Sequence, residues 1–415
     1  QEVAVNGSNN LQITLQAADA KLDEVIITGY RQQKRSTYTG ASTTVNANEL
    51  VNQPGAAFND RIQGIAPGLQ ISSNSGIAGG STFVRLRGTT SVNAGNDPLY
   101  IIDNVFINSE SLQGVRIGGQ TTNPLADINP ADIETIEVLK DANATAIYGS
   151  RGANGVIIIT TKRGSKEGPT RVNLNSQYGF AHYDKLWDLS TGAQHAEILN
   201  EAYINDGGSY ESRPYRPINE VINGVAGQGN PEDQGTYDRL GILFRTATQQ
   251  THNLSISGGN NKTSFYIGGE FSDQPSIIRL QDFRRHSYRT NLDHKISEKL
   301  AIGVSASYAQ TKRQLVRTGD TGGILNTGIH TPTLTPIFKA DGSYNNAERF
   351  NNPYILLENS NNHAHGKRFI ANFFAKWNIL PGLSFKTSWS LDNNDYRESF
   401  YFNANLNEGK GSKGS

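Results

Sequence analysis

Few residues in this chain have the types and spacing that catalysis or metal binding requires. His363 and His365 are two residues apart, so a strand would place both imidazoles on one side, but their neighbours favour a polar loop and we expect no metal. The acidic cluster from Asp392 to Asp395 lacks EF-hand spacing, so a loop calcium site stays open. No Ser-His-Asp set, HExxH motif or paired-carboxylate motif is apparent. We therefore predict that the chain is not an enzyme and needs no cofactor.

The glycine-rich run from Gly149 to Gly155 has the composition of a phosphate-binding loop. Such a loop opens a helix whose N-terminus holds the anion, whereas the β-prone run 156–161 follows here. The Lys-Ser/Thr ending of the phosphate-binding motif is also missing. We predict tight turns at Gly152 and Gly155 and no nucleotide site.

Several charged residues would be enclosed if the chain wraps around its first half. Arg85 and Arg87 share one side of a predicted strand, and Arg151 lies in the glycine-rich run. Glu270 lies on the polar side of a later strand. A buried charge without a partner is costly, so enclosed arginines need carboxylates nearby. The residues alone leave open the alternative that these arginines are solvated.

Composition excludes several classes of protein. Lys and Arg number 38, as do Asp and Glu, so the formal net charge is zero and offers no electrostatic footprint for nucleic acid. The absence of cysteine excludes disulfides and thiolate metal sites. Mean hydropathy is −0.51, and no apolar run approaches the about 20 residues of a transmembrane helix. These values fit a soluble protein or a membrane barrel, whose alternating strands give a weak hydropathy signal.

The two parts of the chain differ in their patterns. The first reads as a small α+β domain with a helix after Pro54, a capped turn at Asn129-Pro130, and strands at 11–16, 83–87, 99–103, 134–140 and 156–161. The second alternates apolar and polar residues in seven segments. These predicted strands are 171–183, 250–258, 263–272, 284–294, 299–311, 368–379 and 383–393.

The connections favour a membrane barrel over a soluble sandwich. Turns after the second, fourth and sixth strands are tight, whereas those after the first, third and fifth are longer, which is the arrangement of outer-membrane barrels. We expect one face of the strands to contact lipid. Its residues are Phe265, Ile267, Ile302, Val304, Phe373, Trp377, Phe385 and Trp389.

Seven strands are too few to enclose the first domain, because barrels with a plugged lumen have about 22. At about 35 residues per strand, 22 strands would need about 770 residues. We therefore interpret the chain as an N-terminal fragment. The expected fold is an α+β plug domain followed by the first strands of a transmembrane antiparallel β-barrel.

The motifs resemble those of SusC/RagA-type TonB-linked outer-membrane transporters of Bacteroidetes. The resemblance rests on 61–69 (RIQGIAPGL), on 97–105 (DPLYIIDNV, where the family usually has Gly at Asn104) and on 132–156, which begins DIETIEVLKD. A further match is the TonB box. Its residues are Asp23, Glu24, Val25, Ile26, Ile27, Thr28 and Gly29.

The resemblance implies energised import across the bacterial outer membrane. The implied partners are TonB with ExbB and ExbD, a SusD-like surface lipoprotein, an oligosaccharide or peptide as cargo, and the lipid bilayer with its lipopolysaccharide. A dimer of transporter–lipoprotein pairs fits the same resemblance. It also implies a plug–barrel lock, for which Arg85, Arg87, Arg151 and Glu270 are the candidates. A surface receptor or signal transducer on the same scaffold is the alternative function.

The resemblance also divides the chain. We expect the tail of an N-terminal extension at 1–20, the TonB box and a linker at 22–39, the plug domain at 40–166, and barrel strands with their loops at 170–415. A β-branched strand between polar flanks can pair edge-on with a partner sheet, which gives the box a physical rationale. By itself that run fits an ordinary edge strand better, and the adjoining plug motifs favour the box.

Overall fold

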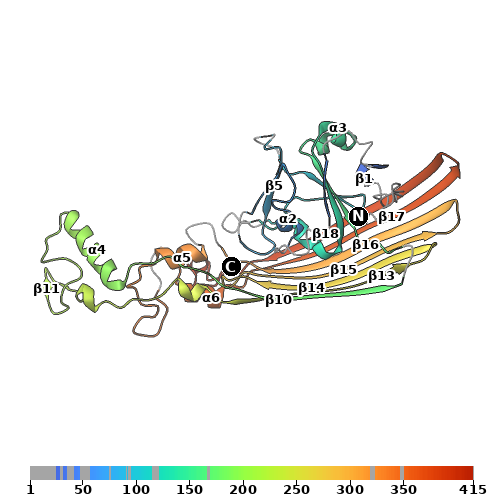
Figure 1. The fold of residues 1–415 in the computed structure, drawn as a ribbon. Coiled ribbons are helices and arrows are strands. Elements are labelled where there is room, and N and C mark those ends of the chain that lie inside the picture. The colour runs from blue at the N-terminus through green and yellow to red at the C-terminus, as the bar shows by residue number, and fades with distance from the viewer. Residues whose placement is uncertain are drawn as a thin grey trace, which may run out of the picture.

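In the computed structural model, a plug domain sits over one side of a long curved sheet, and irregular segments extend beyond one end of that sheet (Figure 1). For 25–28 and 31–34 only the backbone is described. The predictions for 1–20, and for Asp23, Glu24 and Gly29 of the box, lie outside the described residues. The structure describes residues 25–28, 31–34, 42–46, 57–73, 76–89, 91, 95–114, 121–165, 169–317, 323–345 and 350–414.

The plug domain is organised by a five-stranded sheet in the order β3-β8-β9-β6-β7. Its central strands are continuous apolar runs, which is typical of strands that are buried on both faces. Alternate residues of β6 and β9 accordingly enter two separate hydrophobic clusters. Among the described strand pairs of this sheet, β6 and β9 are parallel and the others are antiparallel. The strands are β3 (Ser42–Asn46), β6 (Leu99–Ile102), β7 (Val105–Ile107), β8 (Ile133–Leu139) and β9 (Val156–Thr161).

Smaller elements complete the plug domain. A hairpin of β4 (Leu69–Ser73) and β5 (Thr82–Leu86) packs into the same core. Gly155 lies before β9 with φ +90°, and a Cβ there would come within 2.3 Å of a Leu86 methyl carbon, so the predicted tight turn is confirmed and requires glycine. The helical turns are α2 (Phe58–Arg61), η2 (Pro124–Asp127), η3 (Pro130–Asp132), α3 (Ala142–Thr145) and η4 (Ala146–Gly152).

The curved sheet is a partial β-barrel of seven antiparallel strands, joined in sequence order. All seven predicted strands are present, most of them longer than predicted because pairing continues past the alternating core of each segment. The strands are β10 (Arg171–Ala181), β13 (Ala247–Gly259), β14 (Thr263–Pro275), β15 (Asp282–Lys295), β16 (Leu300–Gln314), β17 (His363–Leu380) and β18 (Leu383–Ser399).

The register gives this sheet two chemically different faces. Opposed pairs such as Val304 with Phe373, and Phe373 with Trp389, share the outer face, where the last two rings stack at 5.5 Å. The plug-facing side carries buried polar residues such as Tyr266 and Asn291. All eight residues that the sequence assigns to lipid lie on the outer face.

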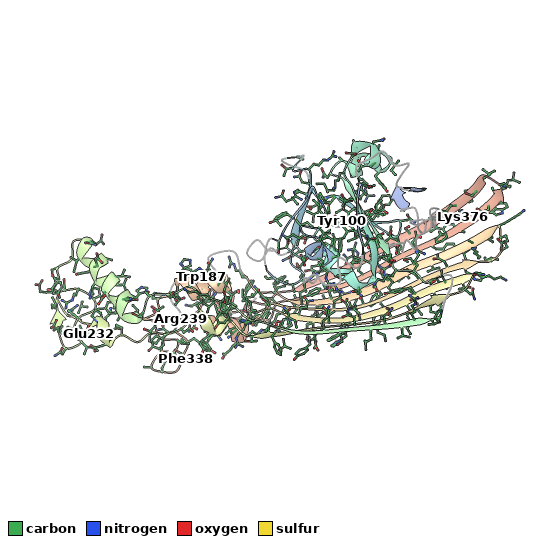
Figure 2. The ribbon with its side chains drawn as sticks, viewed as in Figure 1. Tyr100, Trp187, Glu232, Arg239, Phe338 and Lys376 are labelled. Atoms are coloured by element: carbon green, nitrogen blue, oxygen red, sulfur yellow. The ribbon has the colours of Figure 1, made fainter. Side chains whose placement is uncertain are left out.

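Irregular segments lie beyond one end of the sheet, where Trp187, Arg239 and Phe338 are found, with Glu232 farther out (Figure 2). Lys376 lies toward the opposite end, where the connections are short. Within the part of the chain that the structure describes, no helix is both long and apolar enough to span a membrane. The outer elements are α4 (Gly192–Asn205), β11 (Val221–Ile222), β12 (Val225–Ala226), η5 (Pro231–Asp233), η6 (Gly241–Leu243), α5 (Ile324–His330), α6 (Pro353–Asn359) and α7 (Asn407–Lys410).

Three local predictions differ from the structure. His363 and His365 lie on β17 and not in a loop, because the strand extends past its apolar segment; no metal-binding group of three is found among the described residues. The expected linker contains β2 (Arg31–Lys34), which pairs with β1 (Val25–Thr28). Helix α4 was missed although Thr191 and Gln194 form a capping box, a recognisable start signal.

The two faces of β13 provide a test of the register. We predict that Leu254→Arg, on the outer face in the middle of β13, impairs folding of the full chain into phospholipid vesicles, because a charge near the bilayer midplane costs about 2–4 kcal/mol. Ser257→Arg, on the plug-facing side of the same strand, is the control and should fold as the parent does. Folding is measured by urea titration and heat-modifiable gel mobility. Equal impairment in both variants would contradict the assignment of the faces.

Candidate functional site

Two consecutive 3-10 turns in the plug domain, residues 123–132, face the sheet; we call this segment the tandem turn. In each turn an asparagine side chain accepts a hydrogen bond at 2.9 Å from the main-chain N–H two residues later. A proline follows, whose fixed φ suits the first position of a helical turn. The capping residues are Asn123 and Asn129, and the buried aspartates that end the turns are Asp127 and Asp132.

Arg285 on β15 connects the sheet to the first of these turns. It forms a bidentate ion pair with Glu270 of the neighbouring strand, at 2.7 and 2.8 Å, and both side chains are 1% exposed. Its remaining nitrogen donates to the main-chain oxygens of Ala126 and Ile128 in the plug domain. The pair therefore neutralises the buried guanidinium and leaves donors for the tandem turn.

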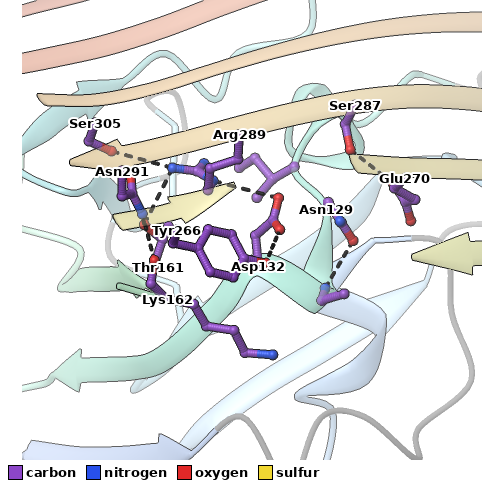
Figure 3. Close-up of polar contacts among 12 residues, drawn as sticks. Asn129, Asp132, Thr161, Lys162, Tyr266, Glu270, Ser287, Arg289, Asn291 and Ser305 are labelled. Atoms are coloured by element: carbon purple, nitrogen blue, oxygen red, sulfur yellow. Dashed lines mark hydrogen bonds and ion pairs between the residues drawn. The ribbon is translucent and has the colours of Figure 1, made fainter. Parts of the chain in front are cut away.

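Arg289, four residues along β15, reaches two plug carboxylates. Figure 3 shows its contact with one of them, Asp132. Its Nη1 donates to Asp103 at 3.2 Å, and its Nε lies 3.6 Å from Asp132. The Tyr266 hydroxyl of β14 donates to the other oxygen of Asp132 at 2.8 Å. Asp103 also accepts a hydrogen bond from Ser305 of β16 at 2.8 Å. Asp103 is therefore held by β15 and β16, and Asp132 by β14 and β15.

The turn between β6 and β7 places Asp103 at this contact. Asp103 and Asn104 both have positive φ, 45° and 70°, which is the geometry of a two-residue hairpin turn. Asparagine and aspartate tolerate that conformation better than other residues with side chains, so Asn104 can occupy the position where glycine is common. The side chain of Asp103 then points into the interface with the sheet.

Two more arginines extend the contact across β16 and β17. Arg313 donates to the main-chain oxygen of Asn123 at 3.2 Å and lies 3.9 Å from Asp127. Arg368 repeats the arrangement of Arg285: it pairs with Asp392 of β18 at 2.7 and 2.8 Å and donates to plug carbonyl oxygens at 2.9 and 3.0 Å. We name these four arginines with their carboxylate partners the clamp. Its arginines are Arg285, Arg289, Arg313 and Arg368.

The clamp encloses charges that would be costly if any partner were missing. Burial raises the pKa of the Asp132 carboxyl, and the guanidinium of Arg289 and the hydroxyl of Tyr266 oppose that rise. Removing one member of a buried ion pair typically costs about 3–5 kcal/mol, because the other charge stays desolvated. The plug domain can therefore leave the sheet only if several such contacts break together or move together.

The structure places the four predicted lock residues differently from the expectation. Arg85 pairs with Asp97, Arg87 pairs with Asp141, and Arg151 lies over the ring of Phe106 at 5.0 Å; all these partners belong to the plug domain. Glu270 does lie at the interface, but its partner Arg285 is in the sheet. The direction is thus the reverse of that expected, because here the sheet supplies the arginines and the plug supplies the acceptors.

The arginines of the clamp were not predicted from the sequence, although one signal was available. Arg285 and Arg289 are four apart, so alternation puts both on the polar face of a predicted strand, where Glu270 also falls. A cation on the enclosed face of a barrel strand needs a partner. The carbonyl acceptors of the tandem turn carry no signal in the sequence, because every residue has a carbonyl.

A scan against protein families matches residues 34–156 to the TonB-dependent Receptor Plug Domain. TonB-dependent receptor P3 of Formosa agariphila is 30% identical over 401 residues, covering 94% of this chain and 36% of that protein. TonB-dependent receptor SusC of Bacteroides thetaiotaomicron is 30% identical over 396 residues, covering 88% of this chain and 36% of that protein. The chain therefore spans about a third of the length of these relatives.

Solved structures agree with these sequence relatives. The RagAB peptide importer in its open-open state has a TM-score of 0.74 and 26% identity, covering 92% of this chain and 43% of that one. In its closed-closed state the TM-score is 0.72 with 25% identity. Both likenesses extend across the plug domain and the curved sheet.

The clamp predicts a specific pattern of stability. Arg285→Met should lower the free energy of unfolding by about 3–5 kcal/mol, because the buried Glu270 carboxylate would lose its cation and keep the Ser287 hydroxyl as a donor. Arg285→Met combined with Glu270→Gln should recover most of that loss. Arg284→Met is the matched control: this neighbour is 51% exposed, pairs with Asp273 on the outer face, and should cost less than about 1 kcal/mol. Urea unfolding and protease protection of the plug domain measure both effects, and a double variant no more stable than Arg285→Met would contradict this account.

Proposed function

The chain belongs to the SusC/RagA-type TonB-dependent receptors, and from this premise we propose that the protein imports a nutrient across the bacterial outer membrane by active transport. Its cargo would be an oligosaccharide or a peptide. This chain supplies the plug domain, which closes the lumen, and seven strands of the surrounding wall.

The clamp is the observation that carries this proposal. Buried arginines hold the plug domain against the polar face of the sheet, so in a completed barrel the plug domain would fill the lumen. Passive diffusion of a large polar solute does not fit such a filled lumen. Import then requires work to displace the plug, and an energised partner must deliver that work from outside the barrel.

We propose that this partner binds the TonB box, residues 23–29. Within it, the backbone of β1 pairs antiparallel with β2, Ile26 lying opposite Gln33. A strand in a two-stranded hairpin keeps one edge for another chain, which would be a strand of TonB driven by ExbB and ExbD. The pull would pass along the chain toward β3 and the plug domain.

A SusD-like lipoprotein is proposed to cap the outer end. The segments beyond the sheet form an outer lobe, residues 187–235, that projects away from the barrel wall (Figure 1). Apolar side chains on this lobe are more than half exposed, which is unusual without a partner. They are Ile198, Tyr210, Ile218, Val221 and Val225. This surface is suited to a protein that captures cargo and delivers it to the lumen.

Deleting Asp23 to Gly29 should abolish accumulation of cargo in whole cells and leave folding and cargo binding intact. The reason is that the box transmits force, whereas binding depends on the outer loops and the plug surface. Accumulation is measured with radiolabelled neutral oligosaccharides and neutral peptides, and binding with the same probes on purified protein. Normal accumulation in the deletion strain would falsify energised import.

A pair of proline variants separates the box from its hairpin. Ile27→Pro removes a main-chain donor from the free edge of the strand that TonB would pair with, because alternate residues of an antiparallel pair direct their N–H groups outward. Accumulation should therefore fall at least tenfold. Gln32→Pro removes the outward donor of the partner strand opposite Ile27 and should keep accumulation within twofold of the parent. If Gln32→Pro were as damaging as Ile27→Pro, the intact hairpin and not the box would be the functional element.

A further inference from the structure

A cavity of about 450 Å³ separates the plug domain from the first three strands of the sheet. Its floor is the second half of the tandem turn with Glu134 and Lys162, and its wall is the plug-facing side of β10, β13 and β14. The volume lies in the range of about 300–1,000 Å³ that ligand pockets occupy. The cavity borders the clamp and shares Asp132 and Glu270 with it, whereas the four clamp arginines come from β15, β16 and β17 and do not line it.

The wall of this cavity on β10 and β13 consists of neutral hydrogen-bonding side chains. They are Asn173, Asn175, Gln177, Asn253, Ser255 and Ser257. The arginines of the clamp lie farther along the same sheet, on β15, β16 and β17. Among the contacts described between β13 and the plug domain is a neutral amide pair, in which Asn129 donates to Asn253 at 3.1 Å. Parting such a pair leaves no charge without a partner, so this side of the plug domain is far easier to detach.

Neutral amides and hydroxyls also suit a particular cargo. They can exchange hydrogen bonds with sugar hydroxyls or peptide groups and so replace the water that the cargo loses. No charged side chain lines the cavity on β10 or β13, so along these two strands the cargo can step from one weak site to the next, as conduction requires. The cations and anions that line the cavity lie on the plug side and at Glu270 of β14, and a highly charged cargo would instead be held there.

We propose that this cavity is the binding site and passage for a neutral, hydroxyl- or amide-rich cargo, and that the plug domain moves away from β10 and β13 while the clamp on β15–β17 stays closed. The proposal rests on the import function and specifies its route. The plug domain would rotate about the clamp, so that the cavity widens beside β10 and β13.

Two cross-links placed on opposite sides of the plug domain test this asymmetry, since the parent chain has no cysteine. Ala131→Cys with Ser255→Cys spans the cavity. Gly114→Cys with Glu398→Cys spans the contact with β18, where the Gly114 N–H donates to Glu398 at 3.0 Å. Each pair is joined in whole cells with a short, reducible bifunctional thiol reagent, and accumulation of radiolabelled neutral oligosaccharides and neutral peptides is followed before and after reduction.

The cavity cross-link should lower accumulation at least tenfold, with recovery on reduction, whereas the β18 cross-link should leave it within twofold. Loss of accumulation with both links would mean that the whole plug domain leaves the barrel and would overturn the hinge. Full accumulation with the cavity linked would overturn the route. Accumulation by the unlinked parent distinguishes the two proposals. If the parent accumulates neither probe while TonB is active, the proposed import function is contradicted, independently of the route past β10 and β13.

A steric variant gives a second measurement if a cross-linked pair does not assemble. Ser257→Trp places an indole in the cavity and should lower accumulation at least fivefold with normal folding. Ile256→Trp, one residue away on the outer face, is the matched control and should be silent. Equal accumulation by Ser257→Trp and Ile256→Trp in a folded protein would overturn the assignment of the cavity.

Discussion

Enclosed arginines must find acceptors, and much of this structure follows from that constraint. Among the side chains that the structure describes, the four largest that are fully buried are all arginines: Arg216, Arg239, Arg285 and Arg368. Each donates to main-chain carbonyl oxygens. A guanidinium carries five donors in a fixed plane, so one side chain can pair with a carboxylate and still hold a neighbouring backbone segment.

The same device serves two regions with different roles. In the outer segments, Arg239 donates to the carbonyl oxygens of Thr335 and Pro336 and so ties together loops that are far apart in the chain. At the clamp, Arg285 and Arg368 tie separate domains together. Irregular backbone has unpaired carbonyls that regular sheets lack, and buried arginines satisfy them without requiring secondary structure.

The clamp and the neutral side chains of β10 and β13 explain how a plug domain can be both secure and movable. Ion pairs enclosed on one side resist separation because each lost partner leaves a desolvated charge. Amide and hydroxyl contacts on the other side exchange readily with water or with a polar cargo. A domain that is held more firmly on one side moves more easily away from its weakly held side. A pull along the chain would therefore displace the plug domain from β10 and β13 first.

The sequence alone determined the elements with strong periodicity. Alternation identified all seven strands of the sheet and their two faces, because one register alone puts Val304, Phe373 and Trp389 on the apolar side. The motifs around Asp103 and Asp132 identified the plug domain before its fold was known. Short elements with little periodicity, such as β4 and β7, were not predicted.

Only the tertiary structure decided which charges meet. Arg85 and Arg87 have the same residue type as Arg285 and Arg289, yet the first two find partners inside the plug domain and the others reach across to it. Sequence pattern specifies the side of a strand on which a charge lies but not what approaches that side. The carbonyl oxygens of the tandem turn become acceptors only where the chain brings them to β15 and β17, and that meeting of distant segments has no signature in local sequence.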